Sequence, residues 1–194
     1  MSTDNGLPAA EHKAPSAQSV TVRYLTPEQC AALITAARKH ARYAQRDACM
    51  VLLAYQHGLR VSELCALRPS DVDYKAATLR IVRRKSGDSG VHPLTGEALR
   101  ALRALKLEGS EAALFTNERG APLSPAGVRA TLRRLGKLAG LPRSNPHALR
   151  HACGYKLVNQ GTDLRLVQAY LGHRDIRSTV RYTAVNAKRF RGLF

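Results

Sequence analysis

Between Asn145 and Tyr182 the sequence holds side chains whose types suit attack on a phosphate ester: His147, Arg150, His173 and Tyr182 itself. An arginine guanidinium presents a charged fork that matches two phosphate oxygens, and a histidine can donate a hydrogen bond or move a proton. A tyrosine hydroxyl is a nucleophile once its proton is removed or its anion is stabilised. Together these residues indicate displacement at a phosphodiester, with protein cations stabilising the charge of the transition state.

Local signals predict that helices carry these groups. Asn145 is a favourable helix N-cap and Pro146 suits the first helical position, so we expect a helix to begin there. His147 then lies in the first turn, with Arg150 three residues later on the same face. A histidine and an arginine at the positive end of a helix make a site for a phosphate-like anion. The other two groups are expected on later helical segments.

The charge of the chain indicates a polyanionic partner. Thirty-one Lys and Arg against 14 Asp and Glu give a net charge of +17 over 194 residues, and a compact domain with that excess repels itself. We favour nucleic acid over an acidic membrane surface because the basic residues are spread over the whole chain. A generally solvated basic surface is the alternative. We find neither a signal peptide nor an apolar run of about 18 residues that could span a membrane.

No metal or cofactor is predicted. The sequence has no G-x-x-x-x-G-K-[ST] loop, its few carboxylates form no evident metal set, and its four cysteines show no zinc-ligand spacing. His147 and His151 stand at i and i+4 and could bind zinc, but no third ligand follows at a recognisable spacing. The cysteines are interpreted as reduced thiols of a cytoplasmic protein.

The pattern along the chain predicts a mainly α fold with one small antiparallel β-sheet (α+β). Residues 1–20 lack apolar periodicity and are interpreted as a disordered or loosely docked tail. Helix-start signals stand at Thr26, which opens a capping box, and at Ser62, Thr95, Ser124 and Asp163. Strands are expected at 71–74, 78–82 and 91–94, with Lys85 in the turn before the third strand and Pro93 confining that strand to an edge.

Basic residues gather in two places. The helix predicted from Ser124 to Leu138 carries a cationic stripe opposite its apolar face, and two more arginines precede the hairpin turn. We expect these residues to contact DNA grooves or backbone: Arg83, Arg84, Arg129, Arg133, Arg134 and Lys137.

Four motifs resemble those of the tyrosine recombinase (phage integrase) family. His147-Ala148-Leu149-Arg150-His151, then Leu171-Gly172-His173, then Tyr182, resemble the family signature. The segment 57–64 is similar to its first arginine motif, which places Arg60, and Lys85 is similar to its β-hairpin lysine. The motifs keep the family's order and approximate spacings over about residues 25–194. The amino-acid sequence of residues 171–186 resembles most that of the short recombinases that invert fimbrial promoter segments.

The resemblance implies a catalytic-domain fold and a role for each matched residue. Arg60 and Arg150 would clamp the scissile phosphate, and His147 and His173 would donate hydrogen bonds to it. Lys85 would protonate the departing 5′ oxygen. Tyr182 would attack, leaving a 3′-phosphotyrosyl link whose energy allows rejoining without ATP, metal or other cofactor. The implied partners are double-stranded DNA carrying a specific recombination site, a homotetramer on that DNA and accessory DNA-bending proteins, in the bacterial cytoplasm at the nucleoid.

Several assignments have alternatives. The general base lies at His147 or at the adjacent position His151; the resemblance favours His147, and His151 is interpreted as a core or supporting residue outside the site. Arg60 could pair only with Glu63 of its own helix. Lys85 could be an ordinary solvated turn lysine, and His173 could merely cap a helix end. Among the seven tyrosines, Tyr182 is expected to present the exposed hydroxyl, whereas Tyr55 and Tyr170 look like core.

The predicted organisation is the tail 1–20, a catalytic domain at 21–185 and a short C-terminal segment at 186–194 that docks on a neighbouring protomer or packs on its own domain. The residues before the first helix are too few for the additional N-terminal core-binding domain of many family members. The function expected is site-specific DNA recombination: inversion, integration or excision. A type IB topoisomerase-like enzyme and a non-catalytic DNA-binding regulator with the same fold are the alternatives.

Overall fold

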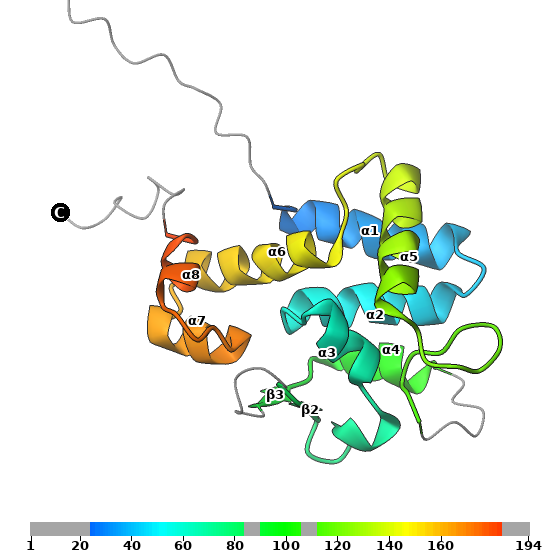
Figure 1. Cartoon of the computed structure of the whole chain (residues 1–194), viewed down its shortest axis with the longest axis horizontal. Coiled ribbons are helices and arrows are strands. Elements are labelled where there is room, and N and C mark those ends of the chain that lie inside the picture. The colour runs from blue at the N-terminus through cyan, green and yellow to red at the C-terminus, as the bar shows by residue number, and fades with distance from the viewer. Residues whose placement is uncertain (1–23, 84–89, 106–111, 184–194) are drawn as a thin grey trace, which may run out of the picture.

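The computed structural model describes residues 24–83, 90–105 and 112–183. Helices make up most of these ranges, and three short strands form a sheet at one side (Figure 1), as the sequence predicted. The helices are α1 Pro27–His40, α2 Ala44–Gln56, α3 Val61–Ala66, α4 Gly96–Arg103, α5 Pro125–Leu138, α6 Pro146–Asn159, α7 Leu164–Leu171 and α8 Arg177–Val180, with a 3₁₀ turn η1 at Pro69–Asp71. The strands are β1 Val72–Asp73, β2 Thr78–Ile81 and β3 Gly90–Pro93.

Helix α2 is the centre of the core. Every residue from Ala48 to Tyr55 is buried, and the helix packs against α1, α4 and α6. Such an all-round apolar helix is stable only when it is covered on all sides. Helix α1 begins at the predicted capping box, in which Thr26 Oγ1 accepts a hydrogen bond from the Gln29 amide and the Gln29 side chain accepts one from the Thr26 amide.

The sheet is antiparallel in the order β1-β2-β3, with Ile81 opposite Gly90 at the end nearest the turn. Pro93, which lacks a backbone donor, lies on β3 at the edge of the sheet, as predicted. The turn itself, with Arg84 and Lys85, lies outside the described residues. So do the predicted tail 1–20 and the predicted C-terminal segment 186–194.

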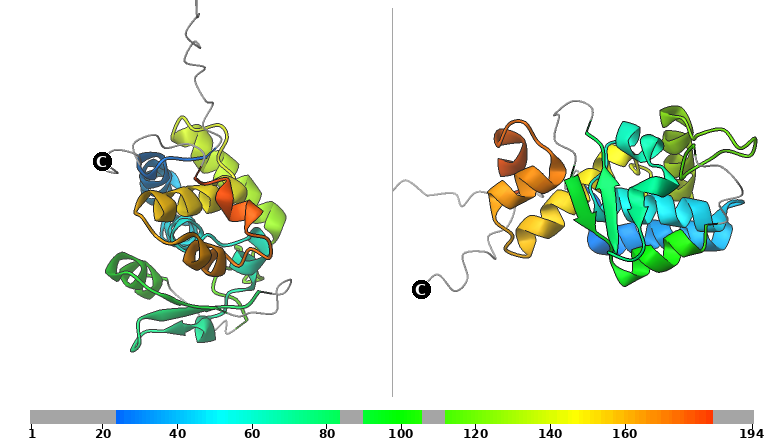
Figure 2. Two further views of the ribbon diagram at one scale, coloured as in Figure 1. Left: turned by 90° about the vertical axis from the view of Figure 1, so that its left-hand side faces the viewer. Right: turned by 90° about the horizontal axis from the view of Figure 1, so that it is seen from below.

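The C-terminal helices form a separate apolar cluster on α6. Helices α7 and α8 lie at one end of α6, while α5 packs near the other end (Figures 1 and 2). Asn145 caps α6 and Asp163 caps α7 through their side-chain oxygens. Gly172 ends α7 in the left-handed conformation, with φ of 62°. The cluster is built from Cys153, Val158, Val167, Leu171 and Tyr182.

One helix start differs from the prediction. Helix α3 begins after Arg60, not at Ser62, because the Arg60 amide donates to Glu63 Oε2 at 2.8 Å. The carboxylate of Glu63, three residues after Arg60, therefore supplies the capping oxygen. In the part of the chain that the structure describes, no helix has the length and apolarity needed to cross a bilayer.

Candidate active site

Four cationic or donor side chains line one cleft of about 390 Å³ between α3, α5 and the first turn of α6: Arg60, Arg129, His147 and Arg150. The N-cap position of α3 supplies the first, α5 the second and α6 the last two. The structure thus brings together three of the residues that the sequence motifs placed around a phosphate. Their catalytic roles stay predictions.

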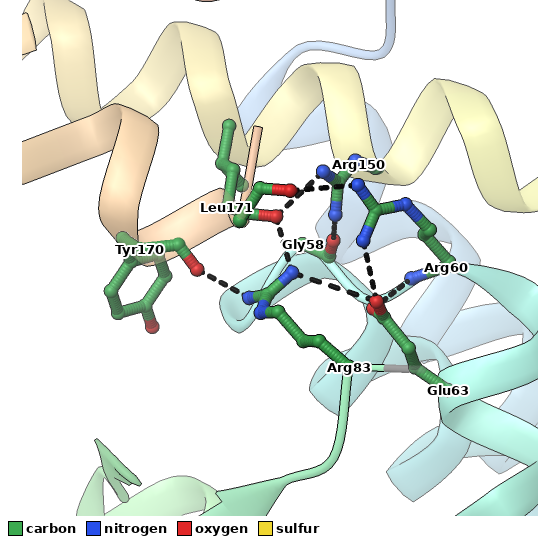
Figure 3. Close-up of polar contacts among 8 residues, drawn as sticks. Gly58, Arg60, Glu63, Arg83, Arg150, Tyr170 and Leu171 are labelled. Atoms are coloured by element: carbon green, nitrogen blue, oxygen red, sulfur yellow. Dashed lines mark hydrogen bonds and ion pairs between the residues drawn. The ribbon is translucent and has the colours of Figure 1, made fainter. Parts of the chain in front are cut away.

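Backbone carbonyls hold the two predicted phosphate-binding arginines (Figure 3). Arg150 is only 4% exposed; its Nη1 donates to Gly58 O at 2.5 Å and its Nη2 to Leu171 O at 2.7 Å. Arg60 donates from Nη2 to Gly172 O at 2.8 Å and from Nη1 to Glu63 Oε1 at 2.6 Å. A guanidinium has five N–H donors. The contacts with described residues occupy two donors of Arg60 and two of Arg150. Both groups are therefore oriented and retain donors for an anion.

Arg83 is a third guanidinium in the same cluster, and it is buried, unlike the exposed side chain expected of a DNA contact. Its side chain is 3% exposed, its Nη2 donates to Tyr170 O at 2.5 Å and its Nη1 to Leu171 O. Residues two apart in a strand point to the same face, and Arg83 continues the buried face of Ile81 while Val82 points outward. The guanidinium consequently anchors the end of α7 and does not reach the protein surface.

The cluster carries more positive than negative charge. Glu63 forms ion pairs with Arg60 at 2.6 Å and with Arg83 at 3.6 Å, so one carboxylate pairs with two of the three guanidinium groups. Burial, followed by the charge of Arg60, lowers the pKa of Arg150 to about 10. A bound anion would compensate this unbalanced charge, which is the property expected of a phosphate site.

Tyr182 is buried, so the prediction of an exposed hydroxyl is wrong. Its side chain is 2% exposed, and its ring lies against Gly154 of α6. The hydroxyl oxygen is 3.1 Å from His151 Nδ1. Burial raises the pKa of this phenol to about 12, although nearby Arg150 and Arg181 oppose the shift. The sequence signal that was missed is the small Gly154, which opens a space for an aromatic ring on α6.

Of the two predicted site histidines, His173 contacts this phenol and His147 contacts His151. The His173 ring stacks on Tyr182 with centroids 6.1 Å apart, and its Nδ1 is 2.9 Å from Thr179 Oγ1. The His147 ring meets His151 edge-on at 4.2 Å. Burial first, and then neighbouring arginines, lowers the pKa of both predicted site histidines, that of His173 to about 4. Both are therefore neutral at neutral pH and each can donate one N–H. Gly172, not His173, caps the end of α7.

His151 is the residue that sequence reasoning left outside the site. The structure places it between His147 and the Tyr182 hydroxyl. Its position at i+4 from His147 puts the two rings on one face of α6, and that spacing was the available signal. The sequence also named His151 as the alternative position for the general base, but its contact with the Tyr182 hydroxyl could not be derived from the spacing alone.

The cationic stripe on α5 is narrower than predicted. Arg129, Arg133 and Lys137 stand at i, i+4 and i+8 and are exposed. Arg134 lies off that line, and its Nη2 is 2.9 Å from the buried carboxylate of Asp47. Arg134 therefore fastens α5 to α2. Within the described ranges, no group of three or more His, Cys, Asp or Glu is placed to hold a metal ion.

Comparison with known proteins finds a matching family, similar sequences and similar solved structures. The sequence model of the Phage integrase family matches residues 23–189. The type 1 fimbriae regulatory protein FimE of Escherichia coli K12 is 44% identical over 180 residues, which cover 89% of this chain and 90% of FimE. Among solved structures, XerA recombinase superposes with a TM-score of 0.75 at 29% identity over 87% of this chain. A lambda integrase dimer bound to a COC′ core site superposes with a TM-score of 0.64 at 25% identity, also over 87%. The matches cover 62% of the XerA chain and 49% of the lambda integrase chain.

Proposed function

The chain belongs to the phage integrase family of tyrosine recombinases, and we propose that it cleaves and rejoins DNA at a specific site through Tyr182. The observation that carries this proposal is the guanidinium cluster. Arg60 and Arg150 are fixed by backbone carbonyls, share a cleft with His147, and lack enough carboxylates to balance their charge. The similarity to XerA recombinase supports recombination over a topoisomerase or a non-catalytic regulator.

The proposed chemistry assigns one task to each group. Arg60 and Arg150 hold two oxygens of the scissile phosphate, and the neutral rings of His147 and His173 donate hydrogen bonds to it. The Tyr182 oxygen attacks phosphorus and the 5′ oxygen leaves, protonated by Lys85. A 3′-phosphotyrosyl bond results, and a 5′ hydroxyl can reverse the step. Because protein cations stabilise the transition state and the bond energy is retained, the proposal needs neither metal nor ATP.

Access to the phosphate requires that Tyr182 be uncovered when DNA binds. At 2% exposure the phenol cannot meet a phosphate in the arrangement described. The ring is held by packing on α6, by the stacked His173 ring and by one hydrogen bond to His151. The carbonyls of α7 that hold Arg60, Arg83 and Arg150 belong to the segment that leads to this tyrosine. We therefore place the change that uncovers Tyr182 in α7 and α8, and not in α6, which carries His151.

Double-stranded DNA is the proposed partner. The net charge of +17 and the exposed cations of α5 support it, and the lambda integrase relative was solved on DNA. Residues 21–185 are the proposed catalytic domain, acting in the bacterial cytoplasm at the nucleoid. Exchange of strands between two duplexes requires several active sites, so a homotetramer on DNA, with accessory DNA-bending proteins, is part of the proposal.

A nicked suicide duplex tests this function. The duplex is taken from a randomised pool selected for binding and is nicked on the 3′ side of the cleaved phosphate. The short fragment that carries the new 5′ hydroxyl then diffuses away, and the covalent adduct accumulates. We expect an adduct with wild-type protein and none with Tyr182→Phe. Tyr74→Phe, at an exposed tyrosine beside β1, is the matched control. An adduct that persists in Tyr182→Phe would refute the assignment, and strand exchange between two intact duplexes separates a recombinase from a topoisomerase.

A further inference from the structure

The hydroxyl of Tyr182 is hydrogen-bonded to His151, a histidine to which the proposed function assigns no task. His151 Nδ1 lies 3.1 Å from the phenol oxygen, and the two rings meet edge-on with centroids 5.7 Å apart. Both side chains are held in place: His151 belongs to α6, and the Tyr182 ring packs against Gly154 and the His173 ring. A heavy-atom distance of 3.1 Å is within the reach required of a general base.

We propose that His151 is the proton acceptor for Tyr182 in strand cleavage and the proton donor to it in strand rejoining. This inference rests on the proposed function. In cleavage the phenol O–H bond breaks, its proton moves to Nδ1, and the phenol oxygen forms the bond to phosphorus. The bond from phosphorus to the 5′ oxygen then breaks, and that oxygen takes a proton from the general acid, for which Lys85 is the candidate. Rejoining reverses each transfer, so the cycle has no net proton gain or loss.

The protonation states of the pair fit these roles. Burial raises the pKa of the Tyr182 phenol to about 12, so the phenol keeps the proton that it must give up. Burial, followed by the charges of His147, Arg181 and Arg150, lowers the pKa of His151 to about 4. The imidazole is therefore neutral, and with its proton on Nε2 it offers a lone pair at Nδ1. A histidinium at this position could not accept the proton.

The bound phosphate would strengthen this base. The titratable and charged groups around His151 are His147 and Arg150 on α6, and Arg181 and Tyr182 after α8. When no anion is bound, the cations among them disfavour a positive charge on His151. A phosphodiester brings one negative charge, and the pentacoordinate transition state brings another, so the imidazolium becomes easier to form when substrate is present. Proton transfer is thereby coupled to DNA binding.

The two adjacent histidines then have different tasks. His147 lines the cleft with Arg60 and Arg150, so its N–H is available to a phosphate oxygen. His151 lies one turn further along α6, on the side of the phenol. One helical face thus carries a group for the phosphate and a group for the nucleophile.

The test uses the suicide duplex and the rate of adduct formation in a single turnover, measured between pH 6 and pH 9. His151→Asn keeps an acceptor oxygen near the place of Nδ1 but cannot take up a proton at these pH values. We expect both His151→Asn and His151→Ala to slow adduct formation by about 10²–10⁴-fold, the range of general-base catalysis. We also expect their rates to rise more steeply with pH than the wild-type rate, since hydroxide must then remove the phenol proton. Added imidazole should restore part of the His151→Ala rate and leave the wild-type rate unchanged.

The contrary outcomes are distinct. His151→Asn within threefold of wild type would show that the residue only orients the phenol. A His151→Ala loss that imidazole does not relieve, with a pH profile parallel to that of wild type, would also overturn the proposal. DNA affinity and thermal melting of each variant show whether it is folded, and His151→Asn, which preserves the polar contact, keeps the test valid if His151→Ala unfolds. If wild type forms no Tyr182-dependent adduct, the proposed function fails. If wild type forms the adduct and the His151 variants form it at the wild-type rate, this inference alone fails.

Discussion

Gly154 of α6 lies directly beneath the ring of Tyr182, so closely that a Cβ at this position would be 2.5 Å from Tyr182 Cε2 and 2.6 Å from Cζ. The absence of a side chain at residue 154 therefore determines where the nucleophile rests. Its hydroxyl reaches His151 one turn earlier on the same helix. Two residues of α6 thus position both ends of one phenol, one by leaving space and one by a hydrogen bond.

Gly154→Ala should slow strand cleavage while leaving the helix intact. Alanine favours a helix interior by about 1 kcal/mol over glycine, but its methyl group must push the Tyr182 ring aside. A displacement of about 1 Å at a reacting group can cost about 10²-fold in rate. Adduct formation on the suicide duplex measures the loss. Gly96→Ala is the control, because its nearest neighbour, Arg100 Nη1, would be an ordinary 3.5 Å away. Equal rates in the two variants would contradict this packing argument.

Arg83→Met should reduce cleavage and stability without changing the salt dependence of DNA binding. The substitution leaves Tyr170 O without its buried donor, which costs about 1–3 kcal/mol, and loosens the end of α7 that precedes His173. Arg83→Lys keeps the charge but not the fork that spans two carbonyls, so it should rescue little. Thermal melting and DNA titrations at several salt concentrations measure both properties. A smaller salt slope in Arg83→Met would mean that this guanidinium contacts phosphate after all.

Local signals in the sequence were sufficient for most of the scaffold. The capping box at Thr26, the Asn145-Pro146 start of α6 and the Gly172 end of α7 all depend on residues close in the chain. The order and spacing of the recombinase motifs were also enough to select Arg60, His147 and Arg150, which share one cleft.

What could not be predicted depends on contacts between distant segments. The direction of Arg83 is set by carbonyls of α7 that lie 87 and 88 residues later, and no local pattern reports such partners. The burial of Tyr182 depends on the space above Gly154. Arg134 was assigned to the α5 stripe because neighbouring charges look alike in sequence, whereas its pairing with Asp47 on α2 is a tertiary contact.

Arg150→Ala should abolish cleavage yet leave most DNA affinity. The guanidinium is the buried member of the phosphate clamp, and its loss removes charge stabilisation that acts mainly in the transition state. The exposed cations of α5 still bind the DNA backbone. Filter binding and adduct assays on the same duplex should show less than about a tenfold change in affinity and a rate loss of about 10³-fold or more. Loss of binding together with cleavage would contradict this division of roles.

The α5 stripe should account for part of the salt dependence of binding. Each lysine or arginine that contacts a phosphate contributes about one to the slope of log affinity against log salt concentration. Arg133→Ala and Lys137→Ala should each reduce the slope by about this amount. Arg134→Ala is the matched control on the same helix, since its guanidinium is engaged by Asp47, and it should change the slope little. Equal effects of all three substitutions on the slope would mean that Arg134 also contacts a DNA phosphate, as the sequence suggested.

Two buried histidines should make the fold less stable in acid. Burial, followed by the charge of His92, lowers the pKa of His57 to about 3, and burial, followed by Arg83, lowers that of His92 to about 4. An unfolded histidine has a pKa of about 6.5, so between these values the unfolded chain binds more protons and stability rises with pH. Stability is therefore highest above pH 6.5 and falls as the pH decreases toward 4, by up to about 1.4 kcal/mol per pH unit for each histidine. Urea unfolding at pH 7 and pH 5 measures the fall, and His57→Gln, which cannot be protonated, should reduce it. A variant that loses stability between these two pH values as fast as wild type would show that His57 is not among the groups responsible.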